Sequence, residues 1–429
     1  MSAPAAGSNS ERFRTISAPF HPRGRCGWGQ PRSGSGVLKE PLVSLRKIFF
    51  WLHLCAGIVA GIVILIMSVT GAAIAFEKDI VAKDEQEVRK VPAPAAGTSR
   101  LALDELLDRA KEKQPGARPS AVTVFADPQA AVSMSFGRTN AYYVNPYTGT
   151  VSEQGAQGTR AFMRLMTDWH RWLGRDGDGR AVGKAITGAC NVAFLFLAVS
   201  GIYLWWPRQW SWNSVKGITL FNGKLSGKAR DWNWHNVIGI WSAPVLVVLT
   251  ATAMIISYKW ASDAVYKVTG TTPPAAGAGP AVEVPQPPVG TKPLGYEALV
   301  LAVQKEMPNW EQISIRFGGS GQRDGAQPVS ISVREQNGWP LFASITLSVD
   351  PFTGSVLKKE SYADFNSGRK VRTWMRFLHT GEALGFFGKL IAALASIGGA
   401  GLVWTGFALA ARRFMAWRCK PAIQEVSSS

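Results

Sequence analysis

Four of the five histidines in this chain occupy positions that recur along the sequence. His53 and His235 lie in the similar segments WLHLCAG and NWHNVIG, near the start of two long apolar stretches. His170 and His379 lie in MRLMTDWHRWLG and MRFLHTGEALG, each just before another apolar stretch. A single histidine near a membrane interface is usually an interfacial residue whose hydrogen bonds are satisfied. We expect His21, in the leader, to be incidental. Two histidines at each of two equivalent positions indicate ligands instead.

The repeat pairs His53 with His235 and His170 with His379, which makes two sites of two imidazoles each. Zinc usually takes four nitrogen, sulfur or oxygen ligands, and no carboxylate or thiolate recurs beside these histidines. Copper is an alternative, but it usually recruits Met or Cys as well. Two opposed imidazoles in an apolar bundle suit six-coordinate haem iron. Because the sequence has no CxxCH motif, we expect two non-covalent b-type haems.

Glycines and arginines near the histidines fit the same interpretation. Gly57 and Gly239 each follow a histidine by four residues, one turn on and on the same helix face. A missing side chain there lets a flat macrocycle lie against the helix. Arg164 and Arg376, together with Arg171, are candidates to hold haem propionates, because arginine matches carboxylates well. Contact with lipid headgroups is the alternative role for these arginines.

The composition and the apolar stretches predict a membrane protein. Only 18% of the 429 residues are charged, against about 25% in soluble proteins. Four cysteines are too few for a disulfide-stapled scaffold or a Cys-rich metal site. A bilayer span takes roughly 20 apolar residues, and four stretches are long enough: 48–76, 185–206, 234–258 and 386–411. We therefore expect an α-helical bundle of four transmembrane helices.

The positive charge of the chain indicates its orientation. Three short segments, 1–47, 207–232 and 411–429, hold +13 of the net +18. Since basic flanking segments stay in the cytoplasm, both termini and the middle loop should be cytoplasmic. The two long connections, 77–185 and 259–385, should face outward. The excess charge therefore reflects membrane topology and contact with the lipid bilayer, and we expect no nucleic acid partner.

Self-comparison indicates a tandem duplication. VNPYTGTV at 144–151 recurs as VDPFTGSV at 349–356, and each half reads as helix, soluble module, amphipathic helix with His, helix. The parallel order implies a pseudo-two-fold axis along the membrane normal. Within the modules, helical periodicity over 101–116 and 294–309 precedes alternating stretches, so each module should be a helix followed by a small antiparallel sheet.

These features divide the chain into nine segments. The expected boundaries are a disordered basic leader (1–44), a first span (45–76), a first outer module (77–160), an amphipathic helix with the second span (161–206), a cytoplasmic loop (207–232), a third span (233–258), a second outer module with a Pro/Gly-rich linker at 270–293 (259–370), an amphipathic helix with the fourth span (371–411), and a cytoplasmic tail (412–429).

Several of these motifs together resemble a known family. They are His53 with Gly57, the NPYTG and DPFTG turns, the HRWLG and FLHTGEALG segments, and WWPR at 205–208. As a set they are similar to the PepSY-associated transmembrane proteins, the iron-regulated, PiuB-like membrane proteins that include ferric-siderophore reductases. The resemblance covers roughly residues 44–413.

The resemblance implies two outer α+β modules of the PepSY type and two b haems with the four histidines as axial ligands. It implies that electrons cross the bacterial inner membrane to a ferric siderophore in the periplasm, where iron is released as Fe(II). Some relatives carry a cytoplasmic flavin/nicotinamide reductase domain. No such domain precedes Ser429, so we expect a separate electron donor.

Two other functions compete with a reductase. In the second interpretation the modules bind a peptide or a protease and the spans serve only as anchors, but this leaves the paired histidines unexplained. A transporter is the third interpretation, because repeats are common in transporters. No ionisable residue lies in the middle of a span to bind a coupling ion, which disfavours it.

Overall fold

The computed structural model describes residues 44–137, 140–152, 155–207, 209–274, 282–288, 290–317 and 327–418. The expected leader up to residue 43, His21, Arg208 of the WWPR motif, part of the linker and the end of the tail lie outside these residues.

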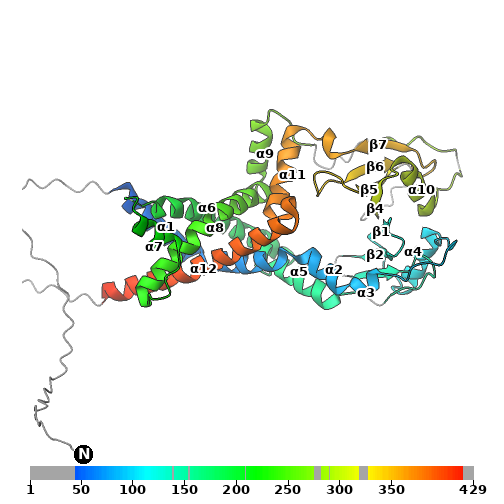
Figure 1. Cartoon of the computed structure of the whole chain (residues 1–429). Helices are drawn as coiled ribbons and strands as arrows, with labels where there is room; N and C mark the ends of the chain where they lie inside the picture. Colours follow the sequence, from blue (N-terminus) through cyan, green and yellow to red (C-terminus); the bar gives the residue numbers. More distant parts are fainter. Residues whose placement is uncertain are drawn as a thin grey trace, which may run out of the picture. The chain divides into compact units, whose positions relative to one another are not determined.

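Among the described residues, four helices are long and apolar enough to cross a membrane (Figure 1). They are α1 (Leu45–Ile74), α6 (Gly179–Trp205), α8 (Gly227–Ser257) and α12 (Gly385–Arg418). Each includes one of the predicted apolar stretches almost entirely. Most begin earlier than predicted, because the helical backbone continues into polar residues that hydropathy alone leaves out.

The four long helices form a bundle in which α1 and α8 each pack against both α6 and α12. Helices α1 and α8 are therefore diagonal to each other. The interior between them contains Ile64, Phe194 and Leu246 with small residues such as Ala60 and Ala395. Small residues let helix backbones approach closely, which is the usual basis of packing between helices in lipid.

Two amphipathic helices precede the second and fourth long helices, as predicted. Helix α5 (Gln157–Trp172) packs against α1 and α6, and α11 (Ser367–His379) packs against α8. The chain then turns back sharply into the next long helix. A Cβ on Gly183 would lie 2.1 Å from the carbonyl oxygen of Trp172, and one on Gly388 would lie 2.2 Å from that of Gly381. Only glycine fits at these two turns.

Several short helices were not predicted. They are α2 (Glu77–Asp84), α3 (Gln86–Arg89), α7 (Trp212–Thr219), α9 (Lys259–Val268) and the 3-10 turns Tyr362–Asp364 and Glu382–Leu384.

The described strands form one antiparallel sheet in the order β3-β2-β1-β4-β5-β6-β7. Its strands are β1 (Ala121–Phe125), β2 (Val132–Phe136), β3 (Asn140–Val144), β4 (Trp310–Arg316), β5 (Val329–Glu335), β6 (Ile345–Val349) and β7 (Val356–Glu360). The expectation of two separate small sheets is wrong, because β1 pairs with β4 from Ala121↔Arg316 to Phe125↔Gln312. We call this β1–β4 pairing the seam.

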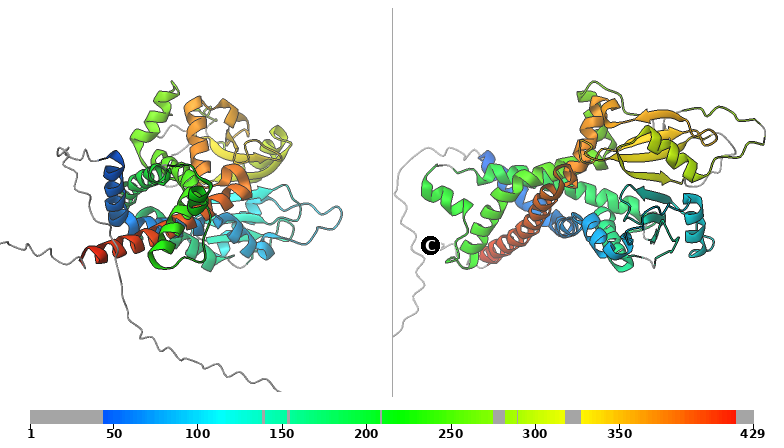
Figure 2. Two further views of the ribbon diagram at one scale, coloured as in Figure 1. Left: turned by 60° about the vertical axis from the view of Figure 1, so that its left-hand side comes forward. Right: turned by 45° about the vertical axis from the view of Figure 1, so that its right-hand side comes forward.

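Helices α4 (Leu103–Glu112) and α10 (Tyr296–Glu306) cover one face of the sheet and share its hydrophobic core (Figure 2). Each helix start is capped by an acid from the other helix. Asp104 accepts hydrogen bonds from the backbone N–H groups of Tyr296 and Glu297, and Glu297 accepts one from that of Leu103. An acid at a helix N-terminus satisfies free N–H groups and favours the helix dipole. These reciprocal caps hold the two helices together above the seam.

The predicted turns are present at both expected places. Asn145 accepts hydrogen bonds from two backbone N–H groups after β3, and Asp350 accepts one after β6. The glycines that follow, Gly149 and Gly354, have φ of 70° and 72°, a left-handed conformation that favours glycine.

The seam predicts a specific crosslink. Thr123 and Ser314 lie directly opposite each other, with their hydroxyl oxygens 2.9 Å apart. In a background where all four cysteines are replaced by serine, Thr123→Cys with Ser314→Cys should form a disulfide under mild oxidation, because opposite Cβ atoms lie about 4.5–5.5 Å apart. Mass spectrometry of the digested, non-reduced protein checks it.

The control pairs Thr123→Cys with Ser332→Cys, which lies one strand further away on β5. Its cysteines are separated by two strand spacings, roughly 9–10 Å, and should stay unlinked. Equal crosslinking of both pairs, or of neither, would contradict the seam.

Candidate functional site

The ring nitrogens of His53 and His235 contact hydroxyl groups on the neighbouring long helices. His53 Nδ1 lies 2.8 Å from Ser200 Oγ on α6, and His235 Nδ1 lies 2.9 Å from Thr405 Oγ1 on α12. Each hydroxyl donates its own proton to a carbonyl earlier in its helix. The hydroxyl oxygen is therefore the acceptor, and Nδ1–H is the donor.

His170 and His379 are held in a similar way, but by backbone carbonyl groups. His170 Nδ1 lies 2.9 Å from the carbonyl oxygen of Met67 on α1, and His379 Nδ1 lies 2.9 Å from that of Leu249 on α8. A carbonyl oxygen only accepts, so Nδ1 carries the proton here too. A threonine hydroxyl one turn away adds a second contact at 3.2 and 3.3 Å respectively: Thr70 and Thr252.

All four imidazoles thus have the same tautomer. Nδ1 carries the proton and bonds to the protein, and the lone pair is left on Nε2. A hydrogen bond at one ring nitrogen fixes the orientation and basicity of the other, which is how metal-ligating histidines are usually held. For His170, burial, with a smaller effect of His379, lowers the pKa to about 4, so the ring is neutral at pH 7.

The rings of His170 and His379, which we call the second pair, lie next to each other. Their ring centroids lie 6.4 Å apart at an interplanar angle of 47°. A metal–nitrogen bond of about 2 Å with a centroid about 1 Å behind each nitrogen would place two imidazoles on one metal roughly 6 Å apart. Helices α5 and α11 therefore bring the two rings to the centroid separation expected for two axial ligands of one metal.

His53 and His235, the first pair, lie on the diagonal helices α1 and α8, where each is the ninth residue. Both rings are partly buried, and each bonds to a long helix that packs against its own. Glycines flank both rings. A Cβ on Gly201 would lie 3.5 Å from His53 Cε1, and one on Gly406 would lie 3.6 Å from His235 Cε1.

The two pairs lie at opposite ends of the bundle. Along α1, 17 residues separate His53 from Thr70, which contacts His170. Along α8, 17 residues separate His235 from Thr252, which contacts His379. At 1.5 Å per residue each separation is about 25 Å, which approaches the roughly 30 Å of the bilayer hydrocarbon.

Gly57 and Gly239 have no packing reason to be glycine. A Cβ would meet only a leucine methyl group, Leu197 at 3.8 Å and Leu402 at 3.7 Å, which is ordinary contact. In mid-helix, glycine costs about 1 kcal/mol relative to alanine. By contrast, a Cβ on Gly61 would lie 2.5 Å from the ring of Phe407. The open space beside Gly57 and Gly239 suits close approach of a flat ligand.

The arginines predicted to bind propionates have other contacts. Arg164 Nε lies 3.8 Å from Asp168, and the guanidinium of Arg376 lies 5.7 Å from the ring of Phe377. Neither contact connects the arginine to His170 or His379, so their propionate role stays a prediction. The positive charge of Arg171 acts on His170, and its guanidinium lies over the ring of Trp172.

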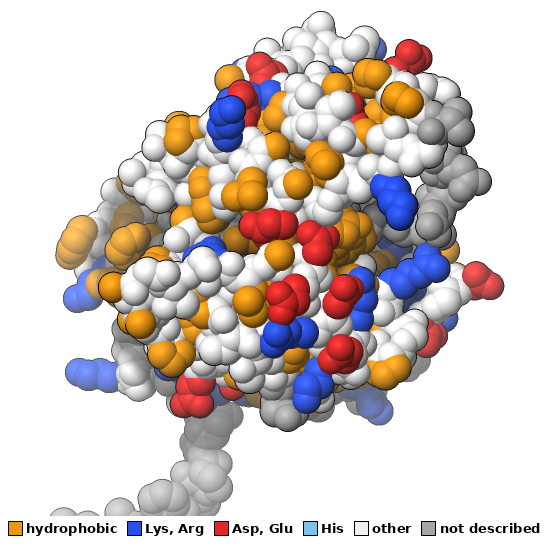
Figure 3. All heavy atoms as spheres, turned by 90° about the vertical axis from the view of Figure 1, so that its right-hand side faces the viewer, with side chains coloured by type: hydrophobic (Ala, Val, Ile, Leu, Met, Phe, Trp, Pro, Cys, Tyr) orange, Lys and Arg blue, Asp and Glu red, His pale blue; other side chains and the backbone are white. Residues whose placement is uncertain are grey.

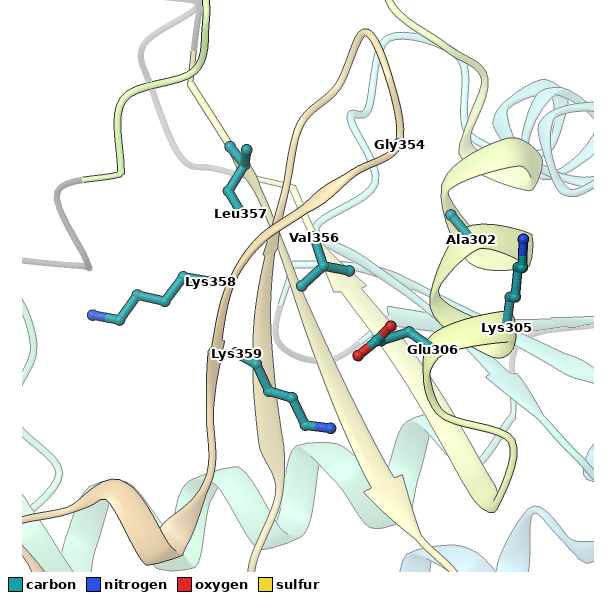
Figure 4. A pocket seen from close by; sticks show the side chains of 8 residues that line it. All are labelled: Ala302, Lys305, Glu306, Gly354, Val356, Leu357, Lys358 and Lys359. Carbon is teal, nitrogen blue, oxygen red and sulfur yellow. The ribbon is translucent and has the colours of Figure 1, made fainter.

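Among the described residues, no group of three or more His, Cys, Asp or Glu side chains is arranged to hold a metal ion. One surface depression, of about 570 Å³, lies between α10 and β7 and includes Lys305, Glu306 and Lys358 (Figure 4). No histidine lines it, and none is visible on the molecular face shown in Figure 3.

Sequence reasoning found the four histidines and missed the groups that hold them. The self-comparison already pairs Gly201 with Gly406 at the 205-residue offset of the repeated turns, and the hydroxyls of Ser200 and Thr405, one residue earlier, could have been found by extending it. The carbonyl partners on α1 and α8 leave no signal in the residue types, because every residue has a carbonyl.

The glycines supply a matched test. Gly61→Ala should lower the thermal unfolding temperature, because the new methyl group overlaps the Phe407 ring. Gly57→Ala, one turn away on the same helix, should keep or slightly raise the unfolding temperature in protein depleted of any bound cofactor, because the methyl group meets no clash and alanine favours the helix. Fluorescence-detected unfolding in detergent compares the two, and an equal loss for Gly57→Ala would mean that this glycine serves helix packing.

Comparisons with known sequences add one finding. Comparison with curated proteins gives no match. The family profile of the PepSY-associated TM region matches residues 50–413, which include the four long helices up to α12 and all four paired histidines. The chain is therefore a multi-pass membrane protein that belongs to the PepSY-associated transmembrane family.

Proposed function

We propose that this protein is an inner-membrane di-haem b reductase that passes electrons to a periplasmic ferric siderophore and releases iron as Fe(II). The observation that carries the proposal is the presence of two histidine pairs at opposite ends of an apolar bundle, each imidazole held through Nδ1 with Nε2 unprotonated.

The residues fit haem better than an isolated metal ion. Each pair supplies two neutral nitrogen ligands, and haem iron needs only two axial ligands beyond its macrocycle. The 6.4 Å separation of the second pair matches that arrangement. Gly57 and Gly239 leave space on the helix face beside the first pair. A bound haem b would supply one-electron redox chemistry at each pair.

The protein's own groups have three roles in this proposal. The Nε2 atoms would hold the haem iron, and the hydroxyl and carbonyl acceptors fix the plane of each ring. The apolar interior around Phe194 and Leu246 keeps water from the space between the pairs. The two pairs, about 25 Å apart along the bundle, would be the two relay points of the electron path across the membrane.

We further propose that the two halves are a tandem duplication. The histidine partners correspond at constant offsets: Met67 and Leu249, Thr70 and Thr252, and Ser200 and Thr405. The module before α5 contains helix α4 and a capped turn, and the module before α11 contains helix α10 and a capped turn. We propose that both modules are of the PepSY type. Residue-by-residue equivalence in contacts is what an internal repeat requires.

The proposed direction follows from the charge pattern. Basic short segments favour cytoplasmic termini, and with that orientation the sheet would face the periplasm on the side of the second pair. The bundle interior is closely packed, so a charged chelate stays outside. The first pair would then receive electrons from a separate cytoplasmic or membrane donor. The siderophore is proposed from the resemblance to iron-regulated membrane proteins.

The first test is haem content. Pyridine haemochrome assay of purified protein should give two haem b per chain. His53→Ala and His235→Ala should each remove the same haem, and His170→Ala and His379→Ala the other, as told apart by their optical spectra.

Loss of one common haem from His53→Ala and His170→Ala would mean that each half binds its own haem. Absence of haem from protein made in iron-supplied cells would contradict the reductase and favour a membrane anchor for peptide-binding modules.

The second test is direction. In proteoliposomes, chemically reduced protein should be re-oxidised by a ferric siderophore added on the periplasmic face. His170→Ala should slow this step strongly with little effect on siderophore binding, because the imidazole does not touch the chelate. Stopped-flow absorbance measures the rate, and re-oxidation that needs the chelate on the cytoplasmic face would contradict the proposed orientation.

A further inference from the structure

Each helix that carries a histidine of the second pair is tied to the rest of the extramembrane part by a two-pronged ion pair. On α5, Arg160 donates through Nε and Nη2 to the two carboxylate oxygens of Glu85, at 2.6 and 2.8 Å. On α11, Arg369 donates through Nη1 and Nη2 to those of Glu360, at 2.8 and 3.0 Å. Two parallel bonds fix the guanidinium plane as well as its position.

The two arginines occupy equivalent positions. Arg160 precedes His170 by ten residues, and Arg369 precedes His379 by ten residues. At 1.5 Å per residue, about 15 Å of helix separates each arginine from its histidine. Each helix is thus held at two points, the arginine near one end and the imidazole–carbonyl bond at the other.

The Glu85 end of the first ion pair is fully buried. Its side chain has 0% exposure and also accepts bonds from Arg89 on α3, at 2.8 Å, and from the hydroxyl of Tyr143 on β3, at 2.7 Å. Burial alone raises the pKa of Glu85, but the bonds from Arg160, Arg89 and Tyr143 outweigh it and lower the pKa. The carboxylate is therefore ionised at pH 7 and joins α5 to the sheet.

Both ion pairs attach to the same row of the sheet. Tyr143 on β3 and Glu360 on β7 lie at the two ends of one line of directly paired residues, which project from the face opposite α4 and α10. The residues between them are all Ser or Thr: Ser133, Thr123, Ser314, Ser332 and Thr346. One rigid row of backbone hydrogen bonds therefore links the two helices that carry the second pair.

We propose that Arg160 and Arg369 are positioning residues, which tie the second histidine pair to the sheet and set the angle between its imidazoles. This rests on the proposed function, because the pair matters as two ligands of one iron. When either arginine loses its pronged contact, its helix pivots about the remaining imidazole–carbonyl bond. The imidazole plane then turns relative to its partner.

The experiment compares Arg160→Gln and Arg369→Gln in the full-length protein. Low-temperature electron paramagnetic resonance of the oxidised protein reports the angle between axial imidazoles, and redox titration gives the midpoint potential of each haem. We expect the signal and the potential of the second-pair haem to shift in both variants. The first-pair haem is the internal reference and should stay unchanged.

Two matched variants separate positioning from loss of an ion pair in general. Arg89→Gln removes a bond to the same Glu85 but lies on α3, which carries no histidine. Arg372→Gln lies on α11 and removes only a bond to Ser262. Neither should shift the second-pair signal. The exchanged pair Glu360→Arg with Arg369→Glu should restore the signal lost in Arg369→Gln, because it rebuilds the pronged contact.

Hydrogen exchange supplies a readout that needs no cofactor. Backbone amides of 157–172 should exchange roughly tenfold faster or more in Arg160→Gln, because a buried carboxylate loses a partner. Those of 367–379 should respond to Arg369→Gln.

Unchanged resonance signals in both variants, or an equal shift in Arg89→Gln, would overturn the proposal. Wild-type protein without haem would refute the proposed function, and unchanged exchange would then refute the positioning role separately.

Discussion

An imidazole inside an apolar bundle must find a partner for its N–H group, and the rest of this structure follows from that requirement. A buried N–H without a partner costs about 1–3 kcal/mol. The four histidines meet the requirement with two hydroxyl groups and two main-chain carbonyl groups. Each solution places the partner on a different helix from the histidine. The hydrogen bonds therefore fix the rings and hold the helices together at the same time.

The interior also contains two residues, one repeat offset apart in the sequence, that differ because they meet in space. Phe194 on α6 and Gly399 on α12 occupy corresponding positions at the 205-residue offset. A Cβ on Gly399 would lie 3.1 Å from the ring of Phe194. Two phenylalanines cannot fill the same central space, so one half supplies the ring and the other supplies the space. Close packing of this kind leaves little room for water between the histidine pairs.

Sequence reasoning predicted the four spans, both amphipathic helices, both capped turns and the four histidines, because apolar periodicity, turn chemistry and a rare residue type are all visible in one dimension. It missed the seam between β1 and β4, since nothing in an alternating strand says which distant strand it pairs with. It also missed Met67 and Leu249, whose carbonyl groups act independently of side-chain type. Arg160 and Arg369 were overlooked because an arginine on an amphipathic helix is ordinary until its partner is known.

The seam has a consequence for how the protein is made. Strands β1 and β4 are separated by about 190 residues that include two long helices. Until the second half of the chain has been synthesised and inserted, β1 has an unpaired edge, which is a template for association with other chains. Strand pairings between residues this distant in sequence form slowly, because the entropy of closing a long loop is lost before the pairing contacts stabilise the chain. Biogenesis of this protein therefore includes an interval in which the edge of β1 is exposed to other chains, and its length is set by the synthesis of the residues up to β4.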